Sequence, residues 1–147
     1  MKRALSVLGV AVALAVTWSV GFVQGQEKQP KKKDLVFVSA DKAEFKEVVP
    51  GVSKAVLWGD HDRGPYGAFT KFAPGNDAGM HTHTNDIWIV VVKGAYRYKD
   101  DAGEKRVGPG DFIRVPGGRK HWSGGDATEG ALFYEESSGK FDLVPSK

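Results

Sequence analysis

The feature that most constrains the fold is a succession of short segments rich in β-branched and aromatic residues, with no helical period from residue 34 onward. Gly, Pro and Asp interrupt these segments at close intervals and mark tight turns. Many short strands separated by such turns are typical of an all-β sandwich or barrel. We therefore predict an all-β fold whose strands cover residues 35–39, 44–49, 55–58, 67–72, 86–92, 95–98, 112–115, 131–135 and 141–144.

The first residues have a different character. Lys2 and Arg3 precede an apolar run over residues 4–23, and a small residue, Gly25, is followed by a polar stretch. This order predicts a secretory signal peptide over residues 1–25, then a flexible linker over 26–33 and a single domain over 34–147. An uncleaved membrane anchor is the alternative, because about 20 apolar residues can span a bilayer. With a cleaved signal peptide, we expect a periplasmic or secreted protein.

Charge and cysteine content exclude several classes of function. The formal net charge is +3, and removal of Lys2 and Arg3 leaves 3 − 2 = +1, because residues 1–25 contain no acid. A nearly neutral mature chain argues against nucleic acid as a partner, and no membrane partner is expected once the signal peptide is gone. The chain has no Cys, so a metal site would have to use His, Asp or Glu.

Residues 86–92 form a strand pattern that is apolar on both faces. Ile87, Ile89 and Val91 would share one face, while Trp88 and its even-numbered neighbours would share the other. One face can line the interior of a barrel. The other would need cover from a neighbouring strand, from the N-terminal segment or from a second copy of the chain in a homodimer.

Three of the four His stand in an arrangement that suits a metal ion. His81 and His83 are two residues apart, so on an extended chain both imidazoles point to one face. His121 follows a Gly/Pro turn much later in the chain, and a barrel could return it to the same point. Three neutral imidazoles suit a divalent transition metal such as Fe, Zn, Mn, Ni or Cu, with positions left open for water or a small-molecule ligand.

The residues around these His resemble the two motifs of the cupin superfamily. Gly75, His81, His83 and Gly94 match the first motif, and Gly110, Pro116, Gly118 and His121 match the second. The resemblance covers residues 75–125 and implies a single-domain cupin, an RmlC-like jelly-roll β-barrel. Among cupins, the chain is similar to small conserved-barrel proteins, including ChrR-like anti-sigma-factor domains.

The sequence departs from the cupin pattern at two positions. Ile87 stands where cupins usually carry a Glu ligand, and Gly125 replaces a usual Asn. Asp86 precedes Ile87 and is a candidate fourth ligand if residues 84–86 are loop; otherwise it would cap the turn or orient a His. Without the Glu, the site resembles the three-His sites of thiol and diketone dioxygenases in the cupin superfamily.

Other polar residues are candidates for supporting roles. Either Glu135 or Glu136 could point inward as an acid or base, although an exposed strand end is the alternative. Arg114 shares strand parity with Phe112 and could face inward to bind an anion. His61 lies in an Asp/Gly/Pro turn and is predicted to be a surface residue.

Two functional hypotheses follow from these expectations. The first is a metal-dependent enzyme, such as an oxygenase, isomerase or hydrolase, acting on a small molecule at an open metal position. The second is a non-catalytic module that binds or senses a metal or a small molecule. The sequence identifies no catalytic residue, and fold alone does not decide between the two.

Overall fold

A computed structural model describes residues 35–146 of the chain. The predicted signal peptide, 1–25, and the predicted linker, 26–33, lie outside these residues. The predicted domain, 34–147, is described except for its first and last residue. Within this part of the chain, the only helical element is a single 3-10 turn, Ala40–Lys42. No helix there is long and apolar enough to cross a membrane.

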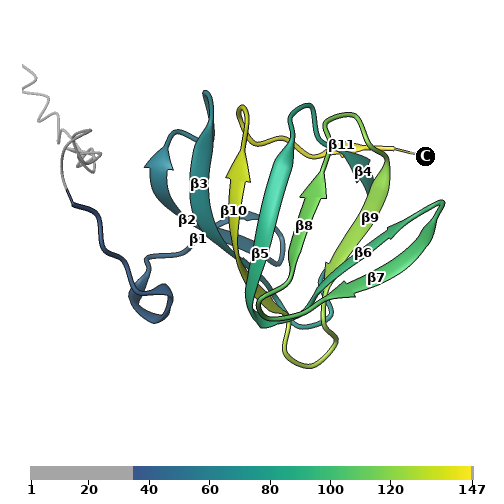
Figure 1. Cartoon of the computed structure of the whole chain (residues 1–147), viewed down its shortest axis with the longest axis horizontal. Coiled ribbons are helices and arrows are strands. Elements are labelled where there is room, and N and C mark those ends of the chain that lie inside the picture. The colour runs from purple at the N-terminus through teal and green to yellow at the C-terminus, as the bar shows by residue number, and fades with distance from the viewer. Residues whose placement is uncertain (1–34, 147) are drawn as a thin grey trace, which may run out of the picture.

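Two antiparallel sheets form the domain, which confirms the all-β jelly-roll prediction (Figure 1). The larger sheet has the strand order β1-β2-β3-β10-β5-β8, and the smaller has the order β11-β4-β9-β6-β7. Their bounds are Lys46–Val49 (β1), Val52–Gly59 (β2), Tyr66–Phe72 (β3), Asp77–Thr82 (β4), Ile87–Gly94 (β5), Tyr96–Asp100 (β6), Gly103–Val107 (β7), Phe112–Val115 (β8), His121–Gly125 (β9), Ala131–Ser137 (β10) and Val144–Pro145 (β11).

The core lies between the two sheets and follows the two-residue alternation of the strands. In β10 every second side chain is buried, starting at Ala131. The larger sheet contributes Ile87, Ile89, Val91 and Phe133, and the smaller sheet contributes aromatic side chains including Tyr96. Ile87, at the usual cupin Glu position, is 5% exposed and belongs to this apolar cluster. Ile87 is therefore part of the core.

The predicted strands match the structure where β-branched and aromatic residues dominate. The structure adds three strands that we did not predict, β4, β7 and β9. β4 and β9 are rich in Gly and small polar residues, and β7 is almost wholly exposed, so none has the composition of a typical strand. The predicted strand over 141–144 is wrong for residues 141–143, which are irregular; only Val144–Pro145 pairs with β4.

The predicted strand over 35–39 is also wrong. These residues pair with no strand in the described part of the chain, and Leu35 and Phe37 are 94% and 87% exposed. Figure 1 shows this segment leading away from the edge of the larger sheet.

The outer face of β5 is not covered by the described part of the chain, since the side chains of Val90 and Val92 are 39% and 44% exposed. The predicted homodimer therefore remains a prediction, with this face as its candidate interface.

Candidate metal centre

Strand pairing brings the three predicted His together. His81 ends up directly opposite His121 because β4 and β9 are antiparallel neighbours in that register. His83 follows the end of β4 and stays on the same side of the chain as His81. All three side chains lie inside the barrel, with exposed fractions of 1% for His81, 9% for His83 and 0% for His121.

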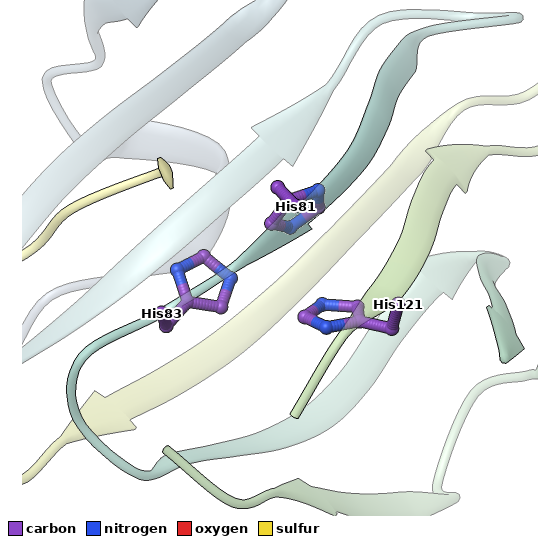
Figure 2. Close-up of side chains that lie close together, drawn as sticks. All are labelled: His81, His83 and His121. Carbon is purple, nitrogen blue, oxygen red and sulfur yellow. The ribbon is translucent and has the colours of Figure 1, made fainter. Parts of the chain in front are cut away.

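The three rings face one another closely enough to share one ion (Figure 2). The ring centroids are 4.3 Å apart for His81 and His121, 4.8 Å for His81 and His83, and 5.4 Å for His83 and His121. One nitrogen from each ring lies within 4.8 Å of the others. An ion about 2.0–2.1 Å from each nitrogen requires nitrogens separated by less than about 4.2 Å, so a pair at the 4.8 Å limit would have to approach by about 0.6 Å when the ion binds. The His triad is therefore positioned to hold a metal.

Backbone carbonyls fix which nitrogen of each ring is available. His81 Nδ1 lies 2.8 Å from the carbonyl oxygen of Gly79, and His121 Nδ1 lies 2.9 Å from that of Arg119. His83 Nδ1 contacts the carbonyl oxygen of Asp142. A carbonyl only accepts, so each Nδ1 carries the hydrogen and each Nε2 keeps its lone pair. These are the outer contacts by which metal-binding His are usually oriented.

The unpaired nitrogen of His121 gives the most direct indication of a ligand. Its Nε2 is buried and has no hydrogen-bond partner among residues 35–146. A buried polar atom without a partner costs about 1–3 kcal/mol, so native structures rarely leave one unexplained. A cation bound to this lone pair would remove that cost.

Electrostatics keep the triad neutral. The pKa of His81 is lowered to about 4, mainly by burial and also by the neighbouring rings of His121 and His83, while the hydrogen bond to Gly79 partly opposes them. Burial also lowers the pKa of His83 and of His121. Neutral imidazole is the form that binds metals, so the site needs no deprotonation at neutral pH.

The structure does not bring Asp86 to the triad. Residues 84–86 are loop, but the Asp86 carboxylate points away, accepting from Arg114 Nη2 at 2.6 Å and from the Gly117 amide at 2.8 Å. These contacts lower the pKa of Asp86, the Gly117 hydrogen bond most. The candidate ligand set is therefore three His without Asp86. Arg114, predicted to face inward, instead has half its side chain exposed and holds Asp86 at the surface.

A narrow cavity adjoins the triad inside the barrel. Its volume is about 30 Å³, enough for a few water-sized groups. His81, His83, Phe141 and Glu135 are among its lining residues. Glu135 thus points inward, which was one of the two predicted alternatives for this residue. Its ion-pair partner is Lys54, which the sequence analysis did not identify.

His61 lies in the turn where it was predicted. Its side chain is half-buried and does not belong to the triad.

Comparison with known proteins agrees with this geometry. A family model described as the cupin domain matches residues 68–135, which include all three His. No curated protein sequence matches the chain. The family match agrees with the resemblance to the cupin superfamily that the two motifs predicted, over a little less than half of the chain.

Solved structures share the fold at low sequence identity. KdgF from Halomonas sp. is 22% identical with a TM-score of 0.56, over 69% of this chain and 94% of that one. The polyketide cyclase RemF from Streptomyces resistomycificus is 18% identical with a TM-score of 0.63, over 78% and 87%. A chain from the Rhodobacter sphaeroides complex of SigE with the anti-sigma ChrR is 18% identical with a TM-score of 0.52, over 66% and 49%.

Proposed function

We propose that this cupin binds one divalent first-row transition metal through Nε2 of His81, His83 and His121, and that the centre acts on a small molecule inside the barrel. The observation that carries the proposal is the convergence of three neutral, carbonyl-oriented imidazoles, one of them with a buried and unpaired Nε2. Three nitrogen ligands leave coordination positions open, as catalytic metal sites require and closed structural sites do not.

A metal on these nitrogens would supply Lewis acidity, polarising an oxygen of a bound molecule and making its protons more acidic. The protein would contribute a dry, mostly apolar wall, formed partly by Phe141, which excludes bulk water from the open positions. We place the activity among metal-dependent oxygenases or isomerases. The likeness to a polyketide cyclase supports an enzymatic role for a barrel of this shape.

One observation favours the second candidate, a non-catalytic binding module. The cavity beside the triad has a volume of only about 30 Å³, whereas pockets for drug-sized ligands measure about 300–1,000 Å³. A site this small fits the metal and a ligand of a few atoms. An assay that detects chemical conversion of a bound small molecule separates the two candidates: an enzyme converts it, whereas a binding module releases it unchanged.

Metal analysis of protein purified without an affinity tag tests the proposal. After reconstitution with Fe, Zn, Mn or Ni, we expect about one equivalent of metal per chain. The His81→Ala/His121→Ala double variant should retain none, because a single imidazole remains. His61→Ala is the matched control and should bind as the unaltered protein does. A wild-type chain that takes up no metal under any of these conditions overturns the proposal.

We also propose that the protein is exported. The basic start at Lys2 and Arg3, the apolar run and the small Gly25 support a signal peptide. N-terminal sequencing of chain recovered from a bacterial periplasm should begin at Gln26. Full-length chain found only in the membrane fraction would instead support the uncleaved anchor.

A further inference from the structure

A buried ionic cluster lies on the wall of the cavity that the His triad adjoins. Lys54 on β2 and Glu135 on β10 form an ion pair with exposed fractions of 3% and 4%. Lys54 Nζ also donates to Thr70 Oγ1 at 3.2 Å, and the Tyr66 hydroxyl donates to Glu135 Oε1 at 2.5 Å. Tyr66 and Thr70 are both on β3 and fully buried. Three neighbouring strands thus build a second buried polar site inside the barrel, beside the His triad.

Stability alone does not account for this cluster. Moving two charges out of water costs free energy that their mutual attraction has to offset, and apolar residues of similar size often stabilise a core as well or better. The same β10 face carries Ala131 and Phe133, which pack in the core without any charge. A buried acid and base in a cavity beside a metal site are the usual signs of a functional group.

The cluster faces the same space as the metal ligands. Glu135, Lys54, His81 and His83 all line the one cavity. The ring of Phe141 lies 4.5 Å from Lys54 Nζ and 6.3 Å from the His83 ring, so it borders both groups. In register, Glu135 is opposite Ile89 on β5, two residues from Ile87. Ile87 on β5 provides no carboxylate at the usual cupin Glu position. The neighbouring strand β10 provides one instead, that of Glu135, which is not among the proposed metal ligands.

The neighbours of Glu135 hold it as an ionised carboxylate. Both Lys54 and Tyr66 donate to Oε1, and Thr70 is a further hydrogen-bond partner of the carboxylate. Burial raises the pKa of Glu135, but the neighbouring Lys54 outweighs it, and the pKa lies below its usual value. The carboxylate is therefore ionised before a molecule binds, and Lys54 stabilises its charge. An anion formed beside it in the cavity would raise its pKa again, so that Glu135 can take up the proton that the molecule loses.

We propose that Glu135 is the proton acceptor of this site, for a small hydroxylated or carbonyl-containing molecule held at the His triad. In this step an O–H or acidic C–H bond of the bound molecule breaks, and its electron pair stays on the molecule. The proton forms an O–H bond on Glu135, which becomes a neutral carboxylic acid. Return of the proton to another atom of the same molecule completes an isomerisation without any oxidant or reductant. This inference rests on the proposed metal centre and selects isomerisation over oxygenation.

Acetohydroxamic acid provides a probe that does not depend on turnover. It has five non-hydrogen atoms, which suits the cavity, and it loses its hydroxyl proton when it binds a metal ion. Zinc is the metal for the test because it has no redox chemistry. Calorimetric titration of the zinc-loaded protein, in buffers of different ionisation enthalpy, counts the protons released to buffer.

We expect the unaltered protein to release clearly less than one proton per bound probe, because the hydroxamate anion beside Glu135 would raise the pKa of this carboxyl and let it hold the proton inside the barrel. Glu135→Gln should release about one proton per bound probe and should bind more weakly near neutral pH. Glu136→Gln is the matched control: the neighbouring carboxylate accepts from Tyr134 on the other face of β10, so its loss should leave the count unchanged. The titratable groups that interact with Glu135 are Lys54, Tyr66, Tyr96 and His83, so the titrations in different buffers are all made at the same pH.

A single substitution in a buried pair can unfold the protein, so a second variant accompanies the first. Lys54→Met/Glu135→Gln removes both charges together and should fold, since paired replacement is often neutral. It should also release about one proton per probe. Release of one proton by the wild type, an unchanged count in both variants, or failure of the probe to bind zinc-loaded protein overturns the inference. Absence of zinc from the protein is a failure of the metal centre itself, which metal analysis reports separately.

Discussion

The ring of Tyr98 is stacked on the ring of His121, with centroids 5.2 Å apart and planes only 16° from parallel. Both residues lie in the smaller sheet, Tyr98 on β6 and His121 on the neighbouring β9. The Tyr98 ring covers one face of the imidazole, while the hydrogen bond from His121 Nδ1 to the carbonyl oxygen of Arg119 limits rotation of the ring in its own plane. Two perpendicular restraints therefore hold the ring that presents the unpaired Nε2.

A polar chain connects the same two residues along the outer edge of the site. The Tyr98 hydroxyl donates to Asp100 Oδ2 at 2.8 Å, and Arg119 Nη2 donates to that oxygen at 2.6 Å. The Arg119 carbonyl then accepts from His121. The Arg119 contact is the first cause that lowers the pKa of Asp100 to about 2, so the carboxylate stays charged and the chain intact over the physiological pH range.

We predict that Tyr98→Leu weakens metal binding without removing a ligand. Loss of an outer contact that orients a metal-binding His typically costs about 10–100-fold in affinity, and we expect about tenfold here. Tyr98→Phe keeps the stack and loses only the hydroxyl, so its effect should be smaller. Competition with a chromophoric zinc chelator measures both affinities. Equal affinities for Tyr98→Leu and the unaltered protein would show that the stack does not orient His121.

The lowered pKa values of the triad predict how the metal-free protein responds to acid. The pKa of His81 is about 4 in the folded state, while an unfolded His titrates near pH 6.5. Between these values the unfolded chain binds more protons than the folded one, so stability decreases as the pH falls from about 6.5 to about 4. Melting temperatures of the metal-free protein over this range should decline steadily.

His81→Gln supplies the control for that pH dependence. The variant lacks one of the titrating groups, so its melting temperature should fall less steeply between about pH 6.5 and pH 4. Bound zinc should steepen the decline in the unaltered protein, because protons compete with the metal for the same nitrogens. An identical slope for His81→Gln and the unaltered protein would rule out His81 as a source of the acid sensitivity.

The spacing of the motifs was sufficient to predict the triad, but not its strands. His81 and His121 lie on β4 and β9, whose Gly and small polar residues carry no strand pattern; pairing with neighbouring strands determines their conformation. The orientation of Glu135 follows the parity of Phe133, yet its burial requires Lys54, 81 positions away, as a partner. Such a pairing depends on the sheet order and is not visible in the sequence.

The two-residue alternation of strands gave a wrong prediction for β8, because the wrong face of this strand was taken as the buried one. Arg114 shares a face with Phe112, and an aromatic residue suggested that this face was buried. In the structure Phe112 is 62% exposed, and the inward side chain of β8 is Val115, at 2%. A short strand at the edge of a sheet has one open side, so an aromatic residue there is a weak indicator of burial.

The position of Asp86, away from the three His, leads to a direct prediction about metal content. Its carboxylate is committed to Arg114 and to the Gly117 amide, which anchors the turn that precedes β9. Asp86→Asn should therefore retain about one equivalent of metal, with an affinity within about threefold of the unaltered protein. Elemental analysis after reconstitution provides the measurement. If Asp86→Asn retains no metal, as is expected of the His81→Ala/His121→Ala variant, Asp86 is a ligand in the loaded protein and the three-His set is incomplete.

Gly94, which closes the first motif, has a structural reason to be glycine. Its φ is +71°, and a Cβ at this position would lie 2.3 Å from the carbonyl oxygen of Gly130. The close approach occurs where the end of β5 meets the start of β10, the strand that carries Glu135. A side chain here would combine left-handed backbone strain with a clash against backbone, which cannot rotate away.

We therefore expect Gly94→Ala to reduce the free energy of unfolding by at least about 2 kcal/mol. Gly64→Ala is the matched control, because a Cβ there meets nothing within 4 Å and the φ is not positive; it should change stability by no more than about 0.5 kcal/mol. Urea unfolding followed by Trp fluorescence measures both. Equal stabilities for the two variants would mean that β5 and β10 can separate at this corner without loss of core packing. In that case the folded structure would not explain why position 94 is a glycine.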